Sequence, residues 1–471
     1  MSSDDKTASG RPNIVYVLTD QWRAQAFGYA GDPNVRTPNI DALAERSVNF
    51  ENAVSVCPVC TPHRASLLTG RYPSTTGMFL NDLYLPSEEL CMAEVLKGAG
   101  YDTAYIGKWH LDGHGRASYI PPERRQGFDY WKVLECTHDY NNSHYYAGND
   151  DTMLTWEGYD AYAQTADARE YIREHAGGER PFFLFVGFGG PHFPHKNAPP
   201  EIKAQYPPEG IELRPNVTEE QADRARAELQ GYYAHCTAID SCVGDLYREL
   251  EETGAAQNTI FVFASDHGDM HGSQGKRSWR KQVPWDESAR VPFLLRYSRV
   301  AEEGRAVRTP LDTPDVLPTL LSLAGVDIPD TVEGADLSGL ILGTSQEEED
   351  RAALFMAVAP FGARDFKAYR GVRTARHTYV RDSDGPWLLY DNEADPYQMK
   401  NLVDDAEHAG LRESLEAKLR SELERVDDDF PTMEEALARW GYTVGKGGEI
   451  PYCGEFRVQS PGAGGGEVCR F

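Results

Sequence analysis

The sequence predicts an α/β fold in which a large, mixed and mostly parallel sheet is flanked by helices and followed by a smaller α+β unit. Short apolar runs alternate with helical stretches from residue 13 to about residue 300, which is typical of parallel strands joined through helices. The pattern changes near residue 360, where short strand-like runs are joined directly by turns. We therefore expect one unit at residues 11–360 and a smaller C-terminal unit at residues 361–471.

The strands of the first unit are predicted from short apolar runs. Asn13–Leu18, Phe182–Val186 and Ile260–Ala264 are continuous runs that indicate strands buried on both faces, and Ala104–Ile106 indicates another short strand. A membrane-spanning helix needs roughly 20 apolar residues. All of these runs are much shorter, so we expect no insertion into a membrane.

Helices are predicted between these strands. Residues 38–46 and 88–98 have apolar side chains at helical spacing, and a long helix is expected over residues 218–252. This long helix opens with Thr218 and Gln221, a pattern that is typical of a capping box.

The C-terminal unit is predicted to contain short antiparallel strands at 367–372, 377–381 and 387–390. A helix follows, with one apolar stripe formed by Leu411, Leu415, Leu419 and Leu423. Residues 113–160 are rich in Tyr, Asn, Gly and His without a clear period. We expect that segment to be an irregular excursion that lines a site.

The composition limits the class of function. The 74 Asp and Glu residues outnumber the 47 Lys and Arg residues and give a formal charge of −27, which argues against a nucleic-acid-binding protein because such proteins present a basic face. An anionic substrate would therefore need a local cluster of positive charge. Residues 1–13 contain no apolar segment, so we expect a cytoplasmic protein, or a periplasmic or secreted one if a signal precedes this chain.

The segment Cys57–Arg71 has the most informative pattern. Pro62 is favoured in the first turn of a helix, which we expect to cover residues 62–68 and to end at Gly70. Cys60 then lies at a helix N-terminus, where free N–H groups lower a thiol pKa and bind anions. Arg64, one turn later, adds a guanidinium that suits a tetrahedral oxyanion.

The pair Cys57 and Cys60 also allows another interpretation, as a C-x-x-C redox motif or half of a zinc site. The sequence has eight cysteines but no second C-x-x-C pair, and no thioredoxin-like pattern surrounds this one. We expect most of the cysteines to be reduced and structural.

Polar side chains follow the predicted strands at the points where the strands end. Because the carboxyl ends of parallel strands meet at one edge of an open sheet, we expect these side chains to converge there. In chain order they are Asp20 and Gln21, Lys108 and His110, His192, and Asp266 and His267.

Asp20, Gln21 and Asp266 supply oxygen ligands that suit a hard divalent cation such as Ca²⁺. His267 leaves zinc open as an alternative. Farther along the chain, Lys281 follows a basic run made of Lys276, Arg277 and Arg280, which we expect to be a solvated loop.

The segments Cys60–Arg64 and Leu68–Arg71 resemble the signature of the type I sulfatases, members of the alkaline phosphatase-like superfamily. Further motifs follow in the family's order from about residue 12 to residue 402. The resemblance implies that a maturase oxidises Cys60 to Cα-formylglycine, whose hydrated aldehyde is the nucleophile.

The resemblance also implies a metal, Ca²⁺ or occasionally Mg²⁺, at the positions of Asp20, Gln21, Asp266, His267 and residue 60. Here the sequence departs from the family, because Gln21 replaces a second Asp found in many members and His267 replaces an Asn. Lys281 begins a segment, residues 281–292, that resembles the family segment whose lysine contacts the sulfate.

We therefore expect a sulfatase that cleaves the S–O bond of a sulfate monoester, and we favour a sulfated carbohydrate as its substrate. Arg64, Lys108 and Lys281 would bind the sulfuryl group. His192 or Lys281 would protonate the leaving alcohol, and His110 would act as the base that releases sulfate. Further substrate contacts are expected from Asn81, His138 and His195.

Three other functions remain open on the sequence. A phosphate diester or phosphonate monoester hydrolase could use the same nucleophile, and a catalytically silent relative could bind only metal or sugar. The third is a redox protein that uses Cys57 and Cys60.

Overall fold

The computed structural model describes residues 10–275, 279–300, 303–360, 366–445 and 450 of the 471-residue chain. Within these ranges a ten-stranded sheet has the order β11-β2-β10-β9-β1-β8-β4-β5-β6-β7, and its central strands β9, β1, β8, β4 and β5 are parallel. The predicted mixed, mostly parallel sheet is confirmed. Its strands are β1 (Asn13–Asp20), β2 (Val48–Phe50), β4 (Asp102–Lys108), β5 (Tyr130–Leu134), β6 (His144–Ala147), β7 (Leu154–Thr155), β8 (Phe182–Pro191), β9 (Thr259–Ser265), β10 (Phe293–Tyr297) and β11 (Arg305–Val307).

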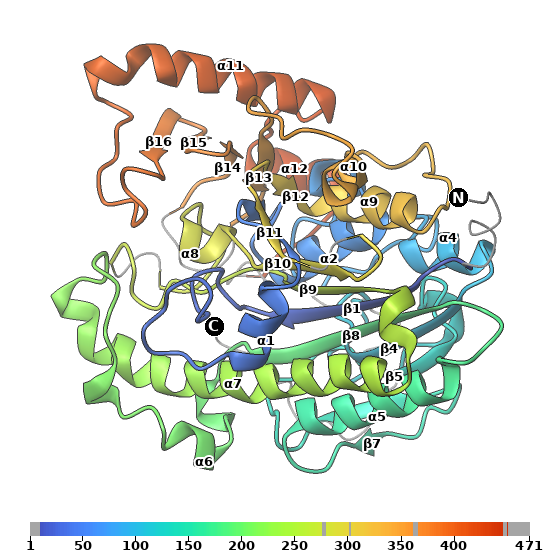
Figure 1. Ribbon diagram of the computed structural model, residues 1–471. Helices are drawn as coiled ribbons and strands as arrows, with labels where there is room; N and C mark the ends of the chain where they lie inside the picture. The colour runs from blue at the N-terminus through green and yellow to red at the C-terminus, as the bar shows by residue number, and fades with distance from the viewer. Residues whose placement is uncertain (1–9, 276–278, 301–302, 361–365, 446–449, 451–471) are drawn as a thin grey trace, which may run out of the picture.

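Helices cover both faces of this sheet, which lies between them in Figure 1. On one face α5 (Asp160–His175) and α7 (Glu219–Glu252) share an apolar core with Val15 and Val17 of β1. On the other face Ile14 and Leu18 belong to a second core, which includes α2 (Cys60–Thr69). Successive side chains of a strand point to opposite faces, so a strand between two helical layers is apolar throughout.

The predicted helices are present within a few residues of their expected bounds. The capping box is not, because the Thr218 side chain makes no capping hydrogen bond and Gln221 is buried beside Gly272. No described helix has both the length and the apolarity needed to cross a bilayer. The shorter helices and 3₁₀ turns are α1 (Pro38–Ala44), α3 (Pro73–Thr76), α4 (Met92–Gly98), α6 (Pro200–Lys203), α8 (Asp286–Ala289), α9 (Val316–Leu323), α10 (Ser338–Leu342), η1 (Pro122–Arg124), η2 (His195–Asn197), η3 (Pro208–Gly210), η4 (Ala255–Asn258), η6 (Thr313–Asp315) and η7 (Ala406–His408).

The segment 113–160 is more regular than the sequence suggested. β5, β6 and β7 lie within it and extend the large sheet at one edge. The expectation of a wholly irregular excursion was wrong because these strands are only two to five residues long, too short to show a period of two.

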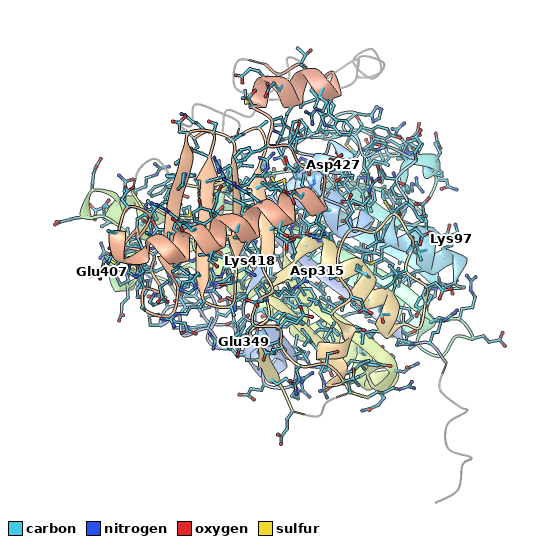
Figure 2. The ribbon with its side chains drawn as sticks, turned by 90° about the horizontal axis from the view of Figure 1, so that it is seen from above. Lys97, Asp315, Glu349, Glu407, Lys418 and Asp427 are labelled. Atoms are coloured by element: carbon cyan, nitrogen blue, oxygen red, sulfur yellow. The ribbon has the colours of Figure 1, made fainter. Side chains whose placement is uncertain are left out.

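In the described C-terminal part of the chain, a four-stranded antiparallel sheet has the order β13-β14-β15-β16. Figure 2 shows α11 lying across this sheet. Leu415, Leu419 and Leu423 of α11 are buried and Leu411 is partly buried, which confirms the predicted leucine stripe. The elements are β13 (Ala353–Ala357), β14 (Tyr369–Arg373), β15 (His377–Asp382), β16 (Gly385–Asp391), α11 (Ala409–Arg425) and α12 (Met433–Trp440), while β3 (Ala53–Val54) and β12 (Leu311–Asp312) form a separate pair.

A buried ion pair ties β14 to the end of α11. Arg370 Nε and Nη2 donate to the two oxygens of Asp428 at 2.6 and 3.1 Å, and both side chains are fully buried. The neighbouring Asp429 pairs with Arg439 at the surface, where both side chains are at least half exposed. These adjacent aspartates therefore differ in environment but not in chemistry.

We expect Asp428→Ala to lower the free energy of unfolding by about 3–5 kcal/mol, because it leaves the Arg370 guanidinium buried without its partner. Asp429→Ala removes an exposed, screened pair and should leave the free energy of unfolding nearly unchanged. Urea denaturation followed by circular dichroism measures both variants. Equal effects of the two substitutions would contradict this account.

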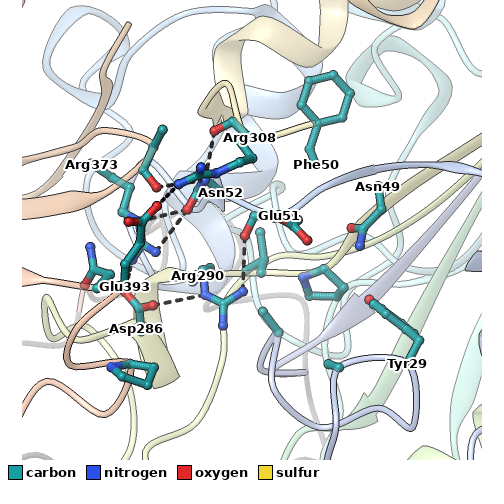
Figure 3. A pocket seen from close by; sticks show the side chains of 17 residues that line it. Tyr29, Asn49, Phe50, Glu51, Asn52, Asp286, Arg290, Arg308, Arg373 and Glu393 are labelled. Carbon is teal, nitrogen blue, oxygen red and sulfur yellow. Dashed lines mark hydrogen bonds and ion pairs between the residues drawn. The ribbon is translucent and has the colours of Figure 1, made fainter. Parts of the chain in front are cut away.

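A cavity of about 490 Å³ lies where the edge of the large sheet meets the C-terminal sheet (Figure 3). Asp286, Arg290, Arg308, Arg373 and Glu393 line it and form ion pairs with one another. Arg373 bonds to Asp286 and, at 3.0 Å, to Asn52 Oδ1, and Arg290 Nε donates to Asp286 Oδ2 at 3.0 Å. We interpret this cavity as a polar junction between the two sheets.

Candidate active site

Eight of the residues singled out in the sequence form one buried cluster at the carboxyl ends of the central strands. β1 ends at Asp20 and β4 at Lys108, while Asp266 and His267 follow β9 and His192 follows β8. Cys60, Arg64 and Lys281 complete the cluster, and each of the eight is at most 2% exposed. The topology thus brings together polar residues that lie as much as 261 positions apart.

Cys60 is the first residue of α2, a helix whose residues are all buried. The helix begins two residues earlier than predicted and ends, as predicted, at Gly70, which has a φ of 67°. Burial and Asp20 raise the pKa of the Cys60 thiol, but Lys108, Lys281 and His110 outweigh them and lower it to about 6. Position 60 therefore favours an anion.

Arg64 and Lys108 surround the carboxylates. Lys108 Nζ donates to Asp20 Oδ2 at 2.6 Å, and Arg64 Nη2 lies 3.6 Å from the same oxygen. Arg64 Nε lies 3.5 Å from Asp266 Oδ2, and neither of these two guanidinium nitrogens has a hydrogen-bond partner. The cations hold the pKa of Asp20 well below its ordinary value although burial acts in the opposite direction.

Lys281 Nζ joins position 60 to the histidines. It lies 3.3 Å from Cys60 Sγ and 2.9 Å from His192 Nε2. His192 Nδ1 donates to the Phe193 carbonyl at 2.6 Å, so its Nε2 is the acceptor. Burial and Lys281 lower the pKa of His192 well below its ordinary value, which keeps this imidazole neutral.

His110 is held by two residues that the sequence analysis did not single out. His110 Nε2 lies 3.0 Å from Asp82 Oδ1, and Arg116 donates to both oxygens of Asp82 at 3.0 and 2.8 Å. Asp82 and His110 have positive φ values of 62° and 58°, which non-glycine residues seldom adopt. Asp82 follows Asn81, which was singled out, but no local pattern predicts its contact with His110.

The cluster contains a donor set that suits a divalent metal. One ligand atom each from Asp20, Cys60, Asp266 and His267 lies within 4.8 Å of the others. Asp266 Oδ2 is buried without a hydrogen-bond partner, and burial and Asp20 raise the pKa of Asp266 to about 6. Two carboxylates packed together without a bound proton are stabilised by cations, and a divalent metal between them would add to Lys108 and Arg64.

His267 is oriented as a ligand. Its Nδ1 donates to the Gly268 carbonyl at 2.9 Å, which leaves the Nε2 lone pair directed into the cluster. Nε2 lies 3.5 Å from Asp20 Oδ1 and 3.5 Å from Asp266 Oδ1. The observed residues thus fit a divalent cation.

Gln21 contributes to the cluster chiefly through its backbone. Its N–H donates to Asp266 Oδ1 at 3.0 Å, and its side-chain Nε2 donates to Asp269. Gln21 Oε1 is buried and has no hydrogen-bond partner. This oxygen is the only side-chain group of Gln21 that is left for a metal.

The three expected substrate contacts lie in different places. Asn81 Oδ1 accepts from the Thr61 N–H at 3.0 Å and so supports the start of α2 beside residue 60. The partly exposed His138 stacks on His192, with ring centroids 4.8 Å apart. His195 lies outside the cluster, where its Nδ1 is 3.1 Å from Glu228 Oε2.

The basic run before Lys281 differs from the prediction where it is described. Arg280 is mostly buried and pairs with Glu228 at 2.9 and 3.1 Å, so a solvated role was wrong for this residue. Ion pairs with the carboxylates of Glu228 and Asp269 hold the guanidinium of Arg280 away from solvent. Lys276 and Arg277 lie outside the described residues.

Cys57 and Cys60, the pair on which the redox interpretation rests, form no disulfide in the structure. The described cysteines, at positions 57, 60, 91, 136, 236 and 242, are all free. Burial raises the pKa of Cys57 to about 12, so Cys57 and Cys60 differ strongly in thiolate character.

Comparison with known families gives two overlapping matches. The family model for sulfatases matches residues 12–326. The model for the C-terminal part of N-sulphoglucosamine sulphohydrolase matches residues 275–425.

Two curated relatives cover most of the chain. An ulvan-active sulfatase of Formosa agariphila is 53% identical over 458 residues, which cover 96% of this chain and 89% of the relative. An endo-4-O-sulfatase of Bacteroides thetaiotaomicron is 31% identical over 482 residues, which cover 89% of this chain and 93% of the relative.

Two solved structures are similar to this chain over most of its length. A protein of glycosaminoglycan metabolism in Bacteroides thetaiotaomicron superposes with a TM-score of 0.82 at 30% identity, over 91% of this chain and 99% of its own. The phosphonate monoester hydrolase of Agrobacterium radiobacter shares the fold, with a TM-score of 0.70 at 22% identity over 94% of this chain and all of its own. The family model and the closely similar relatives together show that this chain belongs to the sulfatase family, with its alkaline phosphatase-like fold.

Proposed function

We propose that this chain is a sulfatase that hydrolyses a sulfate monoester of a sulfated polysaccharide. The observation that carries the proposal is the group of three buried cations, Arg64, Lys108 and Lys281, around position 60 in a chain with a net charge of −27. Such a pocket recognises an anion and stabilises charge on a transferring sulfuryl group. The names of the two curated relatives, an ulvan-active sulfatase and an endo-4-O-sulfatase, support a carbohydrate substrate.

Membership of the family implies a formylglycine at position 60 and a metal ion, which together supply the nucleophilic oxygen. We assign the metal as Ca²⁺, with Mg²⁺ as the alternative, because Asp20, Asp266 and Gln21 offer hard oxygen ligands. His267 would be the imidazole ligand. Metal analysis of the purified protein distinguishes these ions from Zn²⁺, which His267 would favour.

The cluster also assigns the proton transfers. The S–O bond to the leaving alcohol breaks with its electron pair on the alcohol oxygen, and that oxygen must receive a proton. Lys281 is the better placed donor, because its Nζ lies 3.3 Å from Cys60 Sγ whereas His192 Nε2 accepts from this Nζ. His110 helps to lower the pKa of the thiol at position 60, and its Nδ1 is buried without a hydrogen-bond partner, so we assign it the proton that is taken up when sulfate is released.

Asp82 is proposed to position His110 for that proton transfer. We expect Asp82→Asn, which keeps the shape but removes the charge, to lower kcat by roughly tenfold to a hundredfold while KM changes little, because binding through the cations persists. Arg116→Lys serves as the matched control and should have a smaller effect. Steady-state kinetics on a soluble sulfate ester measures both, and an unchanged kcat in Asp82→Asn would contradict the role.

The proposed function is tested with protein co-expressed with a formylglycine-generating maturase, after mass spectrometry confirms the aldehyde at position 60. Sulfate release is measured on ulvan oligosaccharides, on sulfated glycosaminoglycan oligosaccharides and on matched aryl sulfate, phosphate diester and phosphonate esters. We expect the sulfated saccharides to have the highest kcat/KM. Preference for the phosphorus esters would favour the hydrolase alternative, and no turnover at all would favour a silent relative.

A further inference from the structure

A second group of metal-ligating side chains lies beside the catalytic cluster. Among the described residues, one ligand atom each from His195, Glu228 and His271 lies within 4.8 Å of the others. His195 is in η2, Glu228 is on α7 and His271 is in the segment after β9. Three separate parts of the chain therefore meet here.

His271 is the unusual member of this group. It is fully buried, and neither of its ring nitrogens has a hydrogen-bond partner in the described structure. His195 Nε2 is also buried without a partner. An imidazole that is removed from water without a partner for its N–H or its lone pair destabilises the folded state. In native structures, buried polar groups nearly always have a hydrogen-bond partner or another ligand.

The backbone forces His271 into this position. Its φ is 44°, and its N–H donates to Asp269 Oδ1 at 3.1 Å. The ring packs on Tyr232, with centroids 4.3 Å apart, and lies 5.3 Å from the His195 ring. The strained turn and the ring contacts fix the imidazole where it faces the other two ligands.

We propose that His195, Glu228 and His271 form a second metal site, for a borderline-soft divalent cation of the Zn²⁺ class. Two imidazoles and one carboxylate are a ligand set that Zn²⁺ and its neighbours prefer, whereas Ca²⁺ prefers oxygen ligands throughout. Zn²⁺ ligands stand about 3.3 Å from one another at tetrahedral angles, so small rotations of these side chains are sufficient. A fourth position is left for water.

Charges of both signs lie at this site. Glu228 and Asp269 bring two negative charges, Arg280 Nη1 lies 2.9 Å from Glu228 Oε2 and 3.4 Å from Asp269 Oδ2, and Arg224 Nε lies 3.9 Å from Glu228 Oε1. The unpartnered imidazole nitrogens, and not the net charge, favour a metal here. A carboxylate has lone pairs for both a guanidinium and a metal. The Glu228 side chain is 23% exposed, which gives an ion a path from solvent.

The proposed ion would support the catalytic cluster without belonging to it. Asp269 lies 3.8 Å from His271 Nε2 and accepts from the side chain of Gln21, the residue that follows Asp20. A metal on His195, Glu228 and His271 would fix α7 and η2 against the segment that contains Asp266 and Asp269. Its role is therefore structural.

The test measures metal binding instead of turnover. Metal-free full-length protein is first saturated with Ca²⁺ and then titrated with Co²⁺, a spectroscopic substitute for Zn²⁺, and with Zn²⁺ by calorimetry. We expect one further equivalent to bind, with visible d–d absorption and no thiolate charge-transfer band. The missing thiolate band distinguishes this site from one that includes Cys60.

Variants then assign the ligands. His271→Gln and Glu228→Gln should each weaken Co²⁺ binding by at least roughly tenfold to a hundredfold, and Ca²⁺ binding should persist. His408→Gln, at a partly exposed histidine that pairs with Asp405, is the matched control and should bind Co²⁺ as the parent does. Circular dichroism checks folding, and the conservative Glu228→Gln serves if His271→Gln does not fold. Parent protein that binds no additional metal, or variants that bind as tightly as the parent, would overturn the proposal in favour of buried water.

Discussion

Replacing Cys60 by alanine should abolish turnover, with a fall in kcat of roughly a million-fold, as expected when the nucleophile of a cooperating catalytic group is removed. The structure gives the physical reason. Residue 60 is the point on which Lys108, Lys281 and His110 act together, and no other described cysteine has its thiol pKa lowered. Single-turnover and steady-state assays on matured protein measure the loss.

Cys57→Ala is the matched control for this experiment. Cys57 is equally buried and lies three residues away, but burial raises the pKa of its thiol to about 12. We expect this variant to keep the parent's kcat within about tenfold, because only a small cavity is created. A redox mechanism predicts the reverse, with Cys57→Ala inactive. Substantial activity in Cys60→Ala would refute the proposed nucleophile.

Asp20→Asn should lower kcat/KM by roughly a thousand-fold or more and should reduce the bound metal. Asp20 balances Lys108 at 2.6 Å and Arg64 at 3.6 Å, so losing its charge leaves Asp266 to balance the three buried cations and removes a metal ligand. A metal at such a site supplies several kcal/mol of charge stabilisation, which corresponds to about three powers of ten in rate. Elemental analysis and kinetics are measured on the same preparation.

The control for this change is Asp160→Asn. Asp160 is also a buried aspartate, at the start of α5, and burial raises its pKa to about 7. A carboxyl with this pKa is partly protonated near neutral pH, so replacing it by a neutral amide changes the local charge little. Activity and metal content should therefore remain close to those of the parent. Chelation of the parent protein should reproduce the activity loss of Asp20→Asn, and added Ca²⁺ should restore only the parent. If chelation has no effect, the metal assignment fails.

Much of the fold was predictable because buried parallel strands have a strong local signal. The runs at β1, β8 and β9 are apolar on both faces, and their order along the chain indicates helices between them. The outer strands β6 and β7, of which β7 forms the edge, were missed because four and two residues carry too little pattern. The capping box failed for another reason, since burial of Gln221 took precedence over a local hydrogen bond.

The candidate site was predictable as far as it follows from strand ends. Asp20, Lys108 and Asp266 each lie where a central strand stops, and the topology places those ends together. Asp82 and His271 were not predictable in this way. Both residues have positive φ and contact their partners only in the tertiary fold. No spacing in the sequence therefore predicts their roles.

The burial of Arg64, Lys108 and Lys281 affects how fast a polymeric anion binds. A sulfated chain approaching from solution first meets the field of the whole protein, which carries an excess of 27 negative charges, because the attracting lysines and arginine are covered. Dissolved salt shortens that field to about 10 Å at 0.1 M and thus weakens the repulsion before it weakens the short-range attraction inside. Capture of long polyanions should accordingly become faster, not slower, as ionic strength rises from millimolar levels toward 0.1 M.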